Sequence, residues 1–328
     1  MLPCDRTYRY FDFLWSLFLR LTSLLSCNSK ERASTSETMN RFFTLFLTTV
    51  LLLAACSSVA HSASRSHLIA QLPRLPACRA NAVALSAAPF PTLHPTALNA
   101  RVPIMMYHDI LPVKQVPYDL TPTELRQHFD QIKASQMTPI SLDQLMAHLR
   151  TGSLLPEKPI LLTFDDGYGG HYHYAYPLLK EYGYPAVFSI HTSFVGVNVG
   201  RTHVSWQELK MMAHDPLVTI ASHSKTHPAL TKLSEQKLTE EVVDSKKVLE
   251  ARLGSPVKYF TYPYGLYDAR VKQAVAKARY LAALAYAVPT ERFANQSADL
   301  LSLARFEKAQ LTKVMPLASG GSPSTQCK

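Results

Sequence analysis

Two adjacent carboxylates, Asp165 and Asp166, end an apolar run and are the first candidates for chemistry in this sequence. The run, PILLTFDDGY, covers residues 159–168, and Gly167 frees the backbone to turn directly after the pair. Successive side chains of an extended chain point to opposite sides, so one aspartate could hold a metal while the other handles a proton. A simple strand-ending turn explains Asp and Gly equally well, and the motif alone does not decide between the two interpretations.

Two histidines four residues apart, His223 and His227, follow another strand-like run in the segment SHSKTH. On a helix or in a tight turn, this spacing brings both imidazoles to one side, as a metal site needs. The pair is a weak signal by itself, because 13 histidines in 328 residues produce some such spacings by chance. No glutamate stands beside the first histidine, so the HExxH pattern of zinc proteases is excluded.

Two further strand-like runs end in residues that could take part in a reaction. Residues 102–107 are followed by His108 and Asp109. Residues 257–262 lead into Pro263-Tyr264-Gly265, a rigid turn that could aim a backbone N–H. Polar groups therefore gather where apolar runs end.

The elements that would position these residues alternate between strands and helices. Helix starts are marked by Thr121-Pro122-Thr123-Glu124, by Ser141 with Gln144, and by Ser205 with Glu208, which have the spacing of capping boxes. Strands are predicted at residues 102–107, 160–164, 186–190, 217–222 and 257–262, and further helices at 172–182, 234–253 and 268–279. This βα alternation predicts a parallel sheet with helices outside it. No glycine-rich phosphate loop follows the first strand, which favours a barrel over a nucleotide-binding sheet.

A barrel would place function at the carboxyl ends of its strands, where all four groups of candidate residues stand. With 47% hydrophobic and 18% charged residues, the chain can bury one substantial core, and we expect a single domain of about 200–250 residues. Nucleic-acid binding is not expected, because the basic residues do not cluster among aromatic ones.

The pattern of the first 99 residues indicates an exported protein and contains no candidate catalytic residue. Met39-Asn40-Arg41 precedes an apolar run that is too short for a membrane span and has the pattern of a secretory signal. Leu53-Ala54-Ala55-Cys56 resembles the lipobox of bacterial lipoproteins, in which the cysteine becomes the lipidated N-terminus. The predicted organisation is a doubtful leader at 1–38 with translation starting at Met39, a signal peptide at 39–55, a flexible tether at 56–99, a folded domain at 100–312 and a flexible tail at 313–328.

Removing residues 1–55 leaves 28 Lys and Arg against 20 Asp and Glu, a net charge of +8 that suits work beside an anionic envelope surface. Of the five cysteines, Cys4 and Cys27 lie in the doubtful leader and Cys56 would carry lipid. An exported compartment permits a disulfide between Cys78 and Cys327, but free thiols are an equal alternative.

The motifs TFDDGY, SHSKTH and TYPYG, in this order and at this spacing, resemble those of the polysaccharide deacetylase family, also called the NodB-homology family or carbohydrate esterase family 4. The resemblance covers residues 101–306. It implies an α/β fold, a distorted (β/α) barrel. It further implies that Asp166, His223 and His227 bind a divalent metal, usually Zn²⁺, with Co²⁺ or Ni²⁺ as alternatives. Asp165 would be the catalytic base, and the Tyr264 N–H would help to hold the oxyanion.

Most members of the family carry a late histidine as the general acid, and this chain has no equivalent Leu-x-His. Met106-Tyr107-His108-Asp109 instead resembles the circularly permuted branch that deacetylates poly-β-1,6-N-acetylglucosamine, so His108 becomes the candidate acid, with Asp109 as an orienting partner. The arginine that usually begins the third motif is replaced by Thr261. Arg305 resembles an arginine of a late family segment, and a surface salt bridge explains it equally well.

The resemblance therefore implies a metal-dependent N-deacetylase of an N-acetylglucosamine polymer, most simply poly-β-1,6-N-acetylglucosamine. The lipid on Cys56 would anchor it at the periplasmic face of the outer membrane, where polysaccharide export machinery could be a partner. Peptidoglycan and chitin-type oligomers are alternative substrates. A non-catalytic sugar-binding or export-accessory lipoprotein is the alternative from another class.

Overall fold

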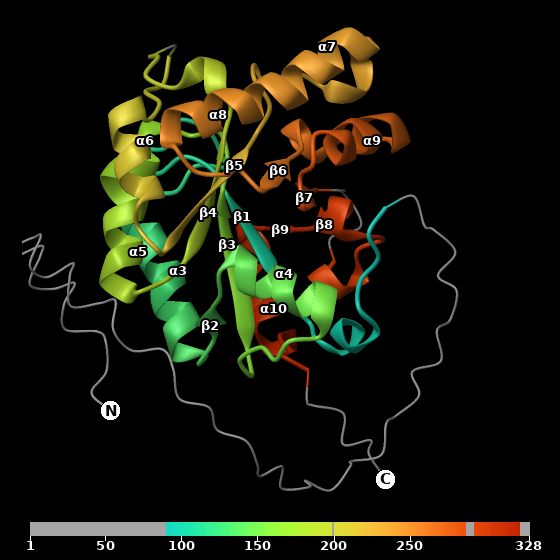
Figure 1. The fold of residues 1–328 in the computed structure, drawn as a ribbon. Coiled ribbons are helices and arrows are strands. Elements are labelled where there is room, and N and C mark those ends of the chain that lie inside the picture. The colour runs from blue at the N-terminus through green and yellow to red at the C-terminus, as the bar shows by residue number, and fades with distance from the viewer. Residues whose placement is uncertain (1–89, 199, 287–291, 322–328) are drawn as a thin grey trace, which may run out of the picture. The chain divides into compact units, whose positions relative to one another are not determined.

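The computed structural model describes residues 90–198, 200–286 and 292–321, and all structural statements below refer to them (Figure 1). Short parallel strands form one sheet at the centre. They are β1 (Ile104–Tyr107), β2 (Thr138–Pro139), β3 (Pro159–Phe164), β4 (Ala186–Ile190), β5 (Val218–Ser222), β6 (Tyr259–Thr261), β7 (Ala282–Ala285), β8 (Leu303–Ala304) and β9 (Phe306–Glu307).

The sheet closes almost completely into a barrel. Neighbouring strands follow the order β8-β7-β6-β5-β4-β3-β1-β9, and β2 pairs with β3 outside this path. β8 pairs with β7 at one end of the order, β9 pairs with β1 at the other, and only Arg305 separates β8 from β9. Residues 303–307 therefore connect β7 to β1 and close the barrel. The predicted (β/α) barrel is confirmed.

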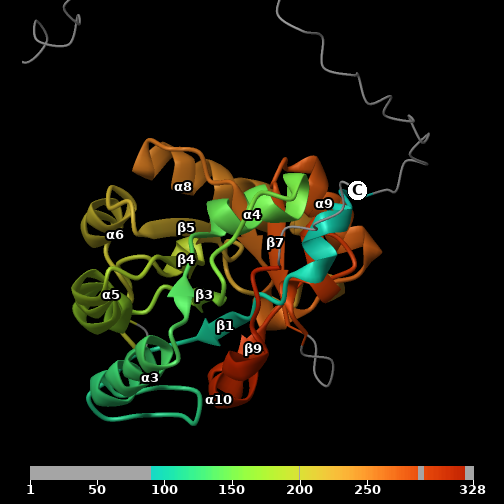
Figure 2. The same ribbon diagram turned by 90° about the horizontal axis from the view of Figure 1, so that it is seen from below.

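Helices lie outside the strands, as the view from below shows (Figure 2). They are α3 (Pro122–Ala134), α4 (Leu142–Thr151), α5 (Tyr176–Tyr182), α6 (Trp206–Ala213), α7 (Glu235–Thr239), α8 (Ser245–Leu253), α9 (Ala269–Lys277) and α10 (Leu311–Val314). The three capping boxes form as predicted, with Thr121, Ser141 and Ser205 each bonding reciprocally to the residue three positions on. They fix where α3, α4 and α6 begin.

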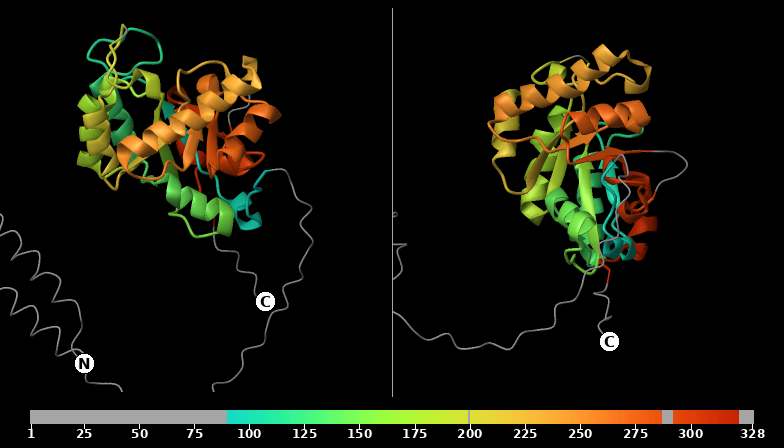
Figure 3. Two further views of the ribbon diagram at one scale, coloured as in Figure 1. Left: turned by 45° about the horizontal axis from the view of Figure 1, so that its top comes forward. Right: turned by 45° about the vertical axis from the view of Figure 1, so that its right-hand side comes forward.

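Two helical segments depart from the prediction by containing a wide π turn. Residues His171–Ala175 form one before α5, and Glu240–Asp244 form the other between α7 and α8. The run from α7 to α8 remains continuous in both views of Figure 3. The apolar pattern that predicts a helix does not distinguish a π turn from an α turn, and such turns are frequent at functional sites.

Alternation along β3 divides its side chains between two clusters of the core. Leu161 belongs to a cluster with Ile104, Val187 and Leu303, which α4 covers. Leu162 and Phe164 belong to a second cluster that reaches the outer helices. Continuing the alternation puts Thr163 on the side of Leu161, and Asp165 follows Thr163 on that side. The strand pattern thus directs the first aspartate towards the barrel axis.

The described fold is longer at both ends than the sequence analysis expects. Residues 95–99, assigned there to the tether, form a 3₁₀ turn that buries Ala97, and the His94 N–H donates to the Leu149 carbonyl at 2.7 Å. In the expected tail, Ser319 and Arg101 exchange two backbone hydrogen bonds of 2.7 and 3.1 Å. These bonds join residues far apart in the sequence, so local composition does not reveal them.

The predicted leader, signal peptide, Cys56, Cys78 and Cys327 all lie outside the described residues. Among the helices that the structure describes, none is both long and apolar enough to cross a membrane.

Candidate active site

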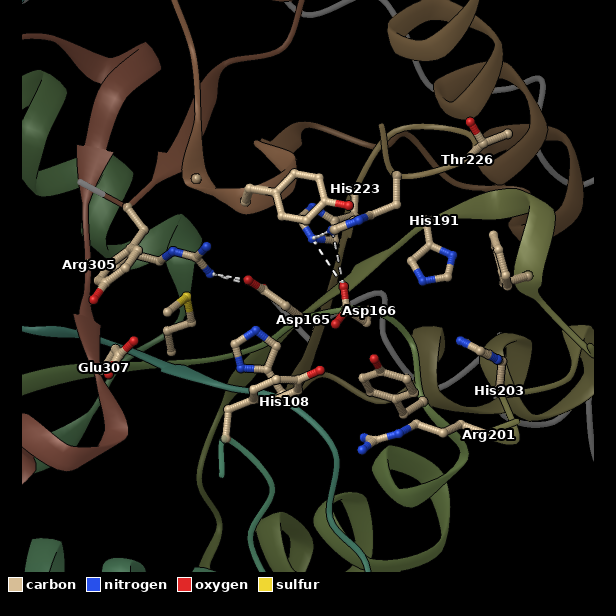
Figure 4. Close-up of a pocket in the computed structure, with 18 residues that line it drawn as sticks. His108, Asp165, Asp166, His191, Arg201, His203, His223, Thr226, Arg305 and Glu307 are labelled. Atoms are coloured by element: carbon tan, nitrogen blue, oxygen red, sulfur yellow. Dashed lines mark hydrogen bonds and ion pairs between the residues drawn. The ribbon is translucent and has the colours of Figure 1, made fainter. Parts of the chain in front are cut away.

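A cavity of about 610 Å³ opens where the parallel strands end (Figure 4). Because parallel strands place their carboxyl ends at the same mouth of a barrel, residues distant in sequence meet there. β1, β3, β5 and β6 each lead into predicted site residues. All six line the cavity, namely His108, Asp165, Asp166, His223, His227 and Tyr264.

Asp166, His223 and His227 form a compact triangle of potential metal ligands. Oδ1 of Asp166 lies 3.4 Å from Nε2 of each histidine, and the two Nε2 atoms are 3.1 Å apart. A tetrahedral ion with bonds of about 2.0–2.1 Å separates its ligands by about 3.3 Å. The three donor atoms are therefore spaced as one face of a tetrahedral zinc-like site would require, and all three residues line the cavity.

Neighbouring groups set the orientation and the pKa of the three ligands of the triangle. The Nδ1–H of His223 donates to the Thr261 carbonyl at 2.8 Å, so Nε2 is the ring nitrogen at the triangle. Burial opposes protonation of His223, but the hydrogen bond to Asp166 and the charge of Asp165 outweigh it and raise the pKa of His223, so a cation would replace the proton on Nε2. Burial lowers the pKa of His227 to about 4, so its imidazole is neutral at pH 7. Burial opposes ionisation of Asp166, but its hydrogen bond to His223 and the nearby imidazoles hold the pKa of Asp166 well below its usual range.

Asp165 is buried and forms an ion pair with a buried arginine. Nη1 of Arg305 lies 2.9 Å from Oδ1 and 2.8 Å from Oδ2 of Asp165, and it also donates to Thr163 Oγ1. Burial would raise the pKa of Asp165, but the charge of Arg305, together with those of His223 and His108, outweighs it and keeps the pKa below the ordinary value. Arg305 is only 1% exposed, so the surface salt bridge considered for it is wrong. Its guanidinium supplies a cation beside Asp165, although Thr261 stands where the family usually has arginine.

Replacing Arg305 with methionine is expected to lower the free energy of unfolding by about 3–5 kcal/mol, because Asp165 would be left as an unpaired buried carboxylate. Denaturant titration of the purified protein measures this loss. The double variant Arg305→Met, Asp165→Leu removes both charges and is expected to recover most of the stability. Equal stability of Arg305→Met and the unaltered protein would show that the ion pair contributes nothing.

His108 stands opposite the triangle at the end of β1. Its ring packs against Tyr118 with centroids 4.9 Å apart, and its carbonyl accepts a hydrogen bond from His171 Nε2 at 3.1 Å. Burial lowers the pKa of His108, while Asp165 and Asp166 act in the opposite direction. His171 itself is 0% exposed and lies in the first π turn.

Asp109 contacts a different set of groups from the one expected. Its Oδ1 accepts the Ile110 N–H at 2.9 Å, and its Oδ2 lies 3.5 Å from Arg201, which also pairs with buried Asp119. Burial raises the pKa of Asp109 to about 6. These contacts tie Asp109 to Ile110 and Arg201, whereas it was predicted to orient His108.

The ring of Tyr264 packs edge-on against that of His227, with centroids 4.7 Å apart. Its φ of 59° is left-handed, and among the described residues its N–H makes no hydrogen bond. Gly265, also left-handed, has no room for a Cβ, which would lie 2.5 Å from Tyr286. The turn thus presents an unpaired N–H, as an oxyanion donor requires.

Left-handed backbone is concentrated at this site. Six described residues other than glycine have positive φ, and four of them belong to the strand-end loops: Asp166, Ser224, His227 and Tyr264. Each costs about 1–3 kcal/mol, and such strain persists where the surrounding structure holds it for function.

The cavity wall also contains residues that the sequence does not single out, among them His191, Arg201 and His203. His191 follows β4 directly, so the strand-end rule that pointed to His108 would have found it. Arg201 gives no such signal, because its partners are distant in sequence. Among the aromatic residues after the first motif, Tyr168 lines the cavity, while Tyr172, Tyr174, Tyr176, Tyr184 and Trp206 pack against the core.

In sequence, the chain is similar to polysaccharide deacetylases. Residues 153–283 match the family model described as polysaccharide deacetylase. YxkH of Bacillus subtilis is 29% identical over 182 residues, which are 55% of this chain and 63% of that protein. The poly-β-1,6-N-acetyl-D-glucosamine N-deacetylase of Escherichia coli is 31% identical over 112 residues, which are 30% of this chain and 17% of that protein.

Solved structures share the fold at lower identity. Streptococcus pyogenes deacetylase PplD, in complex with acetate, aligns with a TM-score of 0.60 and 24% identity, over 69% of this chain and all of that one. IcaB from Ammonifex degensii aligns with a TM-score of 0.57 and 21% identity, over 66% of this chain and 96% of that one.

Proposed function

We propose that this chain, whose residues 153–283 match the polysaccharide deacetylase family model, hydrolyses N-acetyl groups of an N-acetylglucosamine polymer and releases acetate. The observation that carries this proposal is the triangle of Asp166, His223 and His227, with a buried ionised carboxylate, Asp165, directly beside it. These residues would hold a divalent cation, most simply Zn²⁺, with Co²⁺ or Ni²⁺ as alternatives. A cation there would polarise the acetamide carbonyl and lower the pKa of water.

The chain's own residues would carry the protons and hold the developing charge. Asp165 accepts a proton from the water that attacks the acetyl carbon, and the Arg305 charge keeps this carboxylate ionised beforehand. The Tyr264 N–H donates to the oxyanion of the tetrahedral intermediate. His108 donates a proton to the leaving nitrogen as the C–N bond breaks, which yields acetate and a free amine. The pKa of His108, lowered by burial, makes its imidazolium a stronger acid and at the same time leaves a smaller fraction of it protonated.

The preferred substrate is poly-β-1,6-N-acetylglucosamine, because matched relatives from Escherichia coli and Staphylococcus aureus are named as its deacetylases. Peptidoglycan and chitin-type oligomers, which are β-1,4-linked, are the alternatives. The test is acetate release from β-1,6 and β-1,4 N-acetylglucosamine oligomers after chelation, with Zn²⁺, Co²⁺ or Ni²⁺ added back.

Three outcomes of this test are informative. Metal-dependent release from the β-1,6 oligomer alone supports the preferred substrate, and release from the β-1,4 oligomer alone transfers the assignment to the alternatives. Undiminished release after complete chelation contradicts the role of the triangle. No release from any oligomer with any of the three metals favours a non-catalytic sugar-binding or export-accessory lipoprotein.

We also propose that the protein works outside the cytoplasm, anchored by lipid on Cys56 at the periplasmic face of the outer membrane. The support is the signal pattern and the lipobox-like segment in the sequence. Mass spectrometry of the native N-terminal peptide tests it: an acylated Cys56 is expected. A native peptide from residues 1–38 would contradict the proposed start at Met39.

A further inference from the structure

The second π turn lies against the loop that carries both histidines of the triangle. Its residue Glu241 is 8% exposed and faces the segment Ser224-Lys225-Thr226. Oε2 of Glu241 accepts the N–H groups of Lys225 and Thr226, each at 2.8 Å, and Oε1 accepts the Thr226 hydroxyl at 2.6 Å. One carboxylate thus satisfies two backbone donors and one side-chain donor between His223 and His227.

The same turn of helix also holds the other side of His223. Ser245, the first residue of α8, and Ser222, the last residue of β5, are both 0% exposed. Their hydroxyl oxygens are 2.8 Å apart, and Ser245 also bonds to the Val242 carbonyl. This helical segment is therefore hydrogen-bonded to the residue immediately before His223 and to the residue two positions after it.

The loop needs such support because its backbone is strained. Ser224 and His227 both have left-handed φ, at 66° and 59°, without being glycine. Ser224 Oγ accepts the His227 N–H at 3.0 Å, so the two strained residues are also bonded to each other. Without an external anchor, relaxation of either residue would rotate the His227 imidazole away from Asp166.

We propose that Glu241 is a positioning residue for the metal site, which presets the loop so that His223 and His227 meet Asp166 at ligand distance. This inference rests on the proposed metal-binding role of the triangle. Glu241 contacts neither metal nor substrate in this proposal and acts through the backbone of residues 225 and 226. Groups that orient ligands in this way typically contribute 10–100-fold to metal affinity.

The test compares metal affinity in full-length variants, measured by competition of Zn²⁺ or Co²⁺ with a chromogenic chelator. Glu241→Met keeps the length of the side chain but removes all three acceptor contacts, and is expected to weaken metal binding by about 10–100-fold. Glu241→Gln retains an oxygen acceptor and is expected to restore much of the affinity. The matched control is Glu240→Met, which removes a neighbouring charge from the same turn, where Glu240 pairs with Lys237 at the surface. Its affinity is expected to equal that of the unaltered protein.

Thermal unfolding of the metal-free variants separates positioning from simple loss of stability. A purely structural role would lower the metal-free Tm of Glu241→Met and leave metal affinity unchanged, and that result overturns the inference. If Glu241→Met fails to fold, Thr226→Val replaces it. This variant removes only the hydroxyl contact and is expected to weaken metal binding by a smaller factor, and unchanged affinity would again overturn the inference. Absence of metal binding in the unaltered protein overturns both this inference and the proposed function, whereas normal binding in Glu241→Met overturns this inference alone.

Discussion

Asp165→Asn is expected to lower the rate of acetate release by about 10³-fold while metal binding persists. The asparagine amide keeps the size of the carboxylate but cannot accept a proton from water, and general-base contributions lie near 10²–10⁴-fold. The three ligand atoms of the triangle are left in place, because Asp165 contributes none of them. Acetate release and metal content are measured on the same preparation.

Stability must be followed in this variant, because asparagine leaves Arg305 without its charged partner. Denaturant titration of Asp165→Asn gives that cost separately from the rate. Asp130→Asn, a substitution at the surface where Asp130 accepts a bond from Tyr182, serves as the control and is expected to keep full activity. Full activity in Asp165→Asn would overturn the assignment of Asp165 as the base.

His223→Ala is expected to abolish both metal binding and turnover. It removes one of the three ligand atoms of the triangle, together with the Nδ1–H bond to the Thr261 carbonyl that orients this imidazole, so only two ligands remain. Loss of a direct ligand should exceed the 10–100-fold effect of losing a group that only orients one, so we expect metal affinity to fall more than about 100-fold. Chelator competition measures the affinity.

His203→Ala provides the comparison for His223→Ala. His203 lines the same cavity but lies outside the triangle, and its Nδ1 bonds to the Val197 carbonyl. Its removal is expected to leave metal affinity unchanged. Equal affinities in the two variants would show that the cation is held somewhere other than the triangle.

The parts of the site that follow strands could be predicted from sequence, because local patterns determine them. The apolar run before Asp165, the capping boxes and the alternation of strands and helices are all short-range signals. They were sufficient to bring His108, Asp166 and His223 to one mouth of a barrel. The roles of these residues in catalysis remain predictions until the variants are measured.

The contacts that hold the site together could not be predicted, because they join distant residues. Arg305 meets Asp165 across 140 positions, and it does so from between two strands of two residues each, which are too short to give a periodic pattern. The burial of His171 was missed for a related reason. A π turn changes which side of a helix faces the core, and HYHYAY contains no signal that marks it.

Because residues 303–307 close the barrel and lie near the end of the domain's sequence, the barrel can close only after most of the domain has been synthesised. These residues are synthesised after the other proposed site residues, and Arg305 among them is the counter-ion of Asp165. Until they dock between β7 and β1, Asp165 has no guanidinium beside it and the barrel stays open. Under the proposed function, a chain that ends before residue 303 would lack both this counter-ion and the strands that close the barrel, and we expect it to release no acetate.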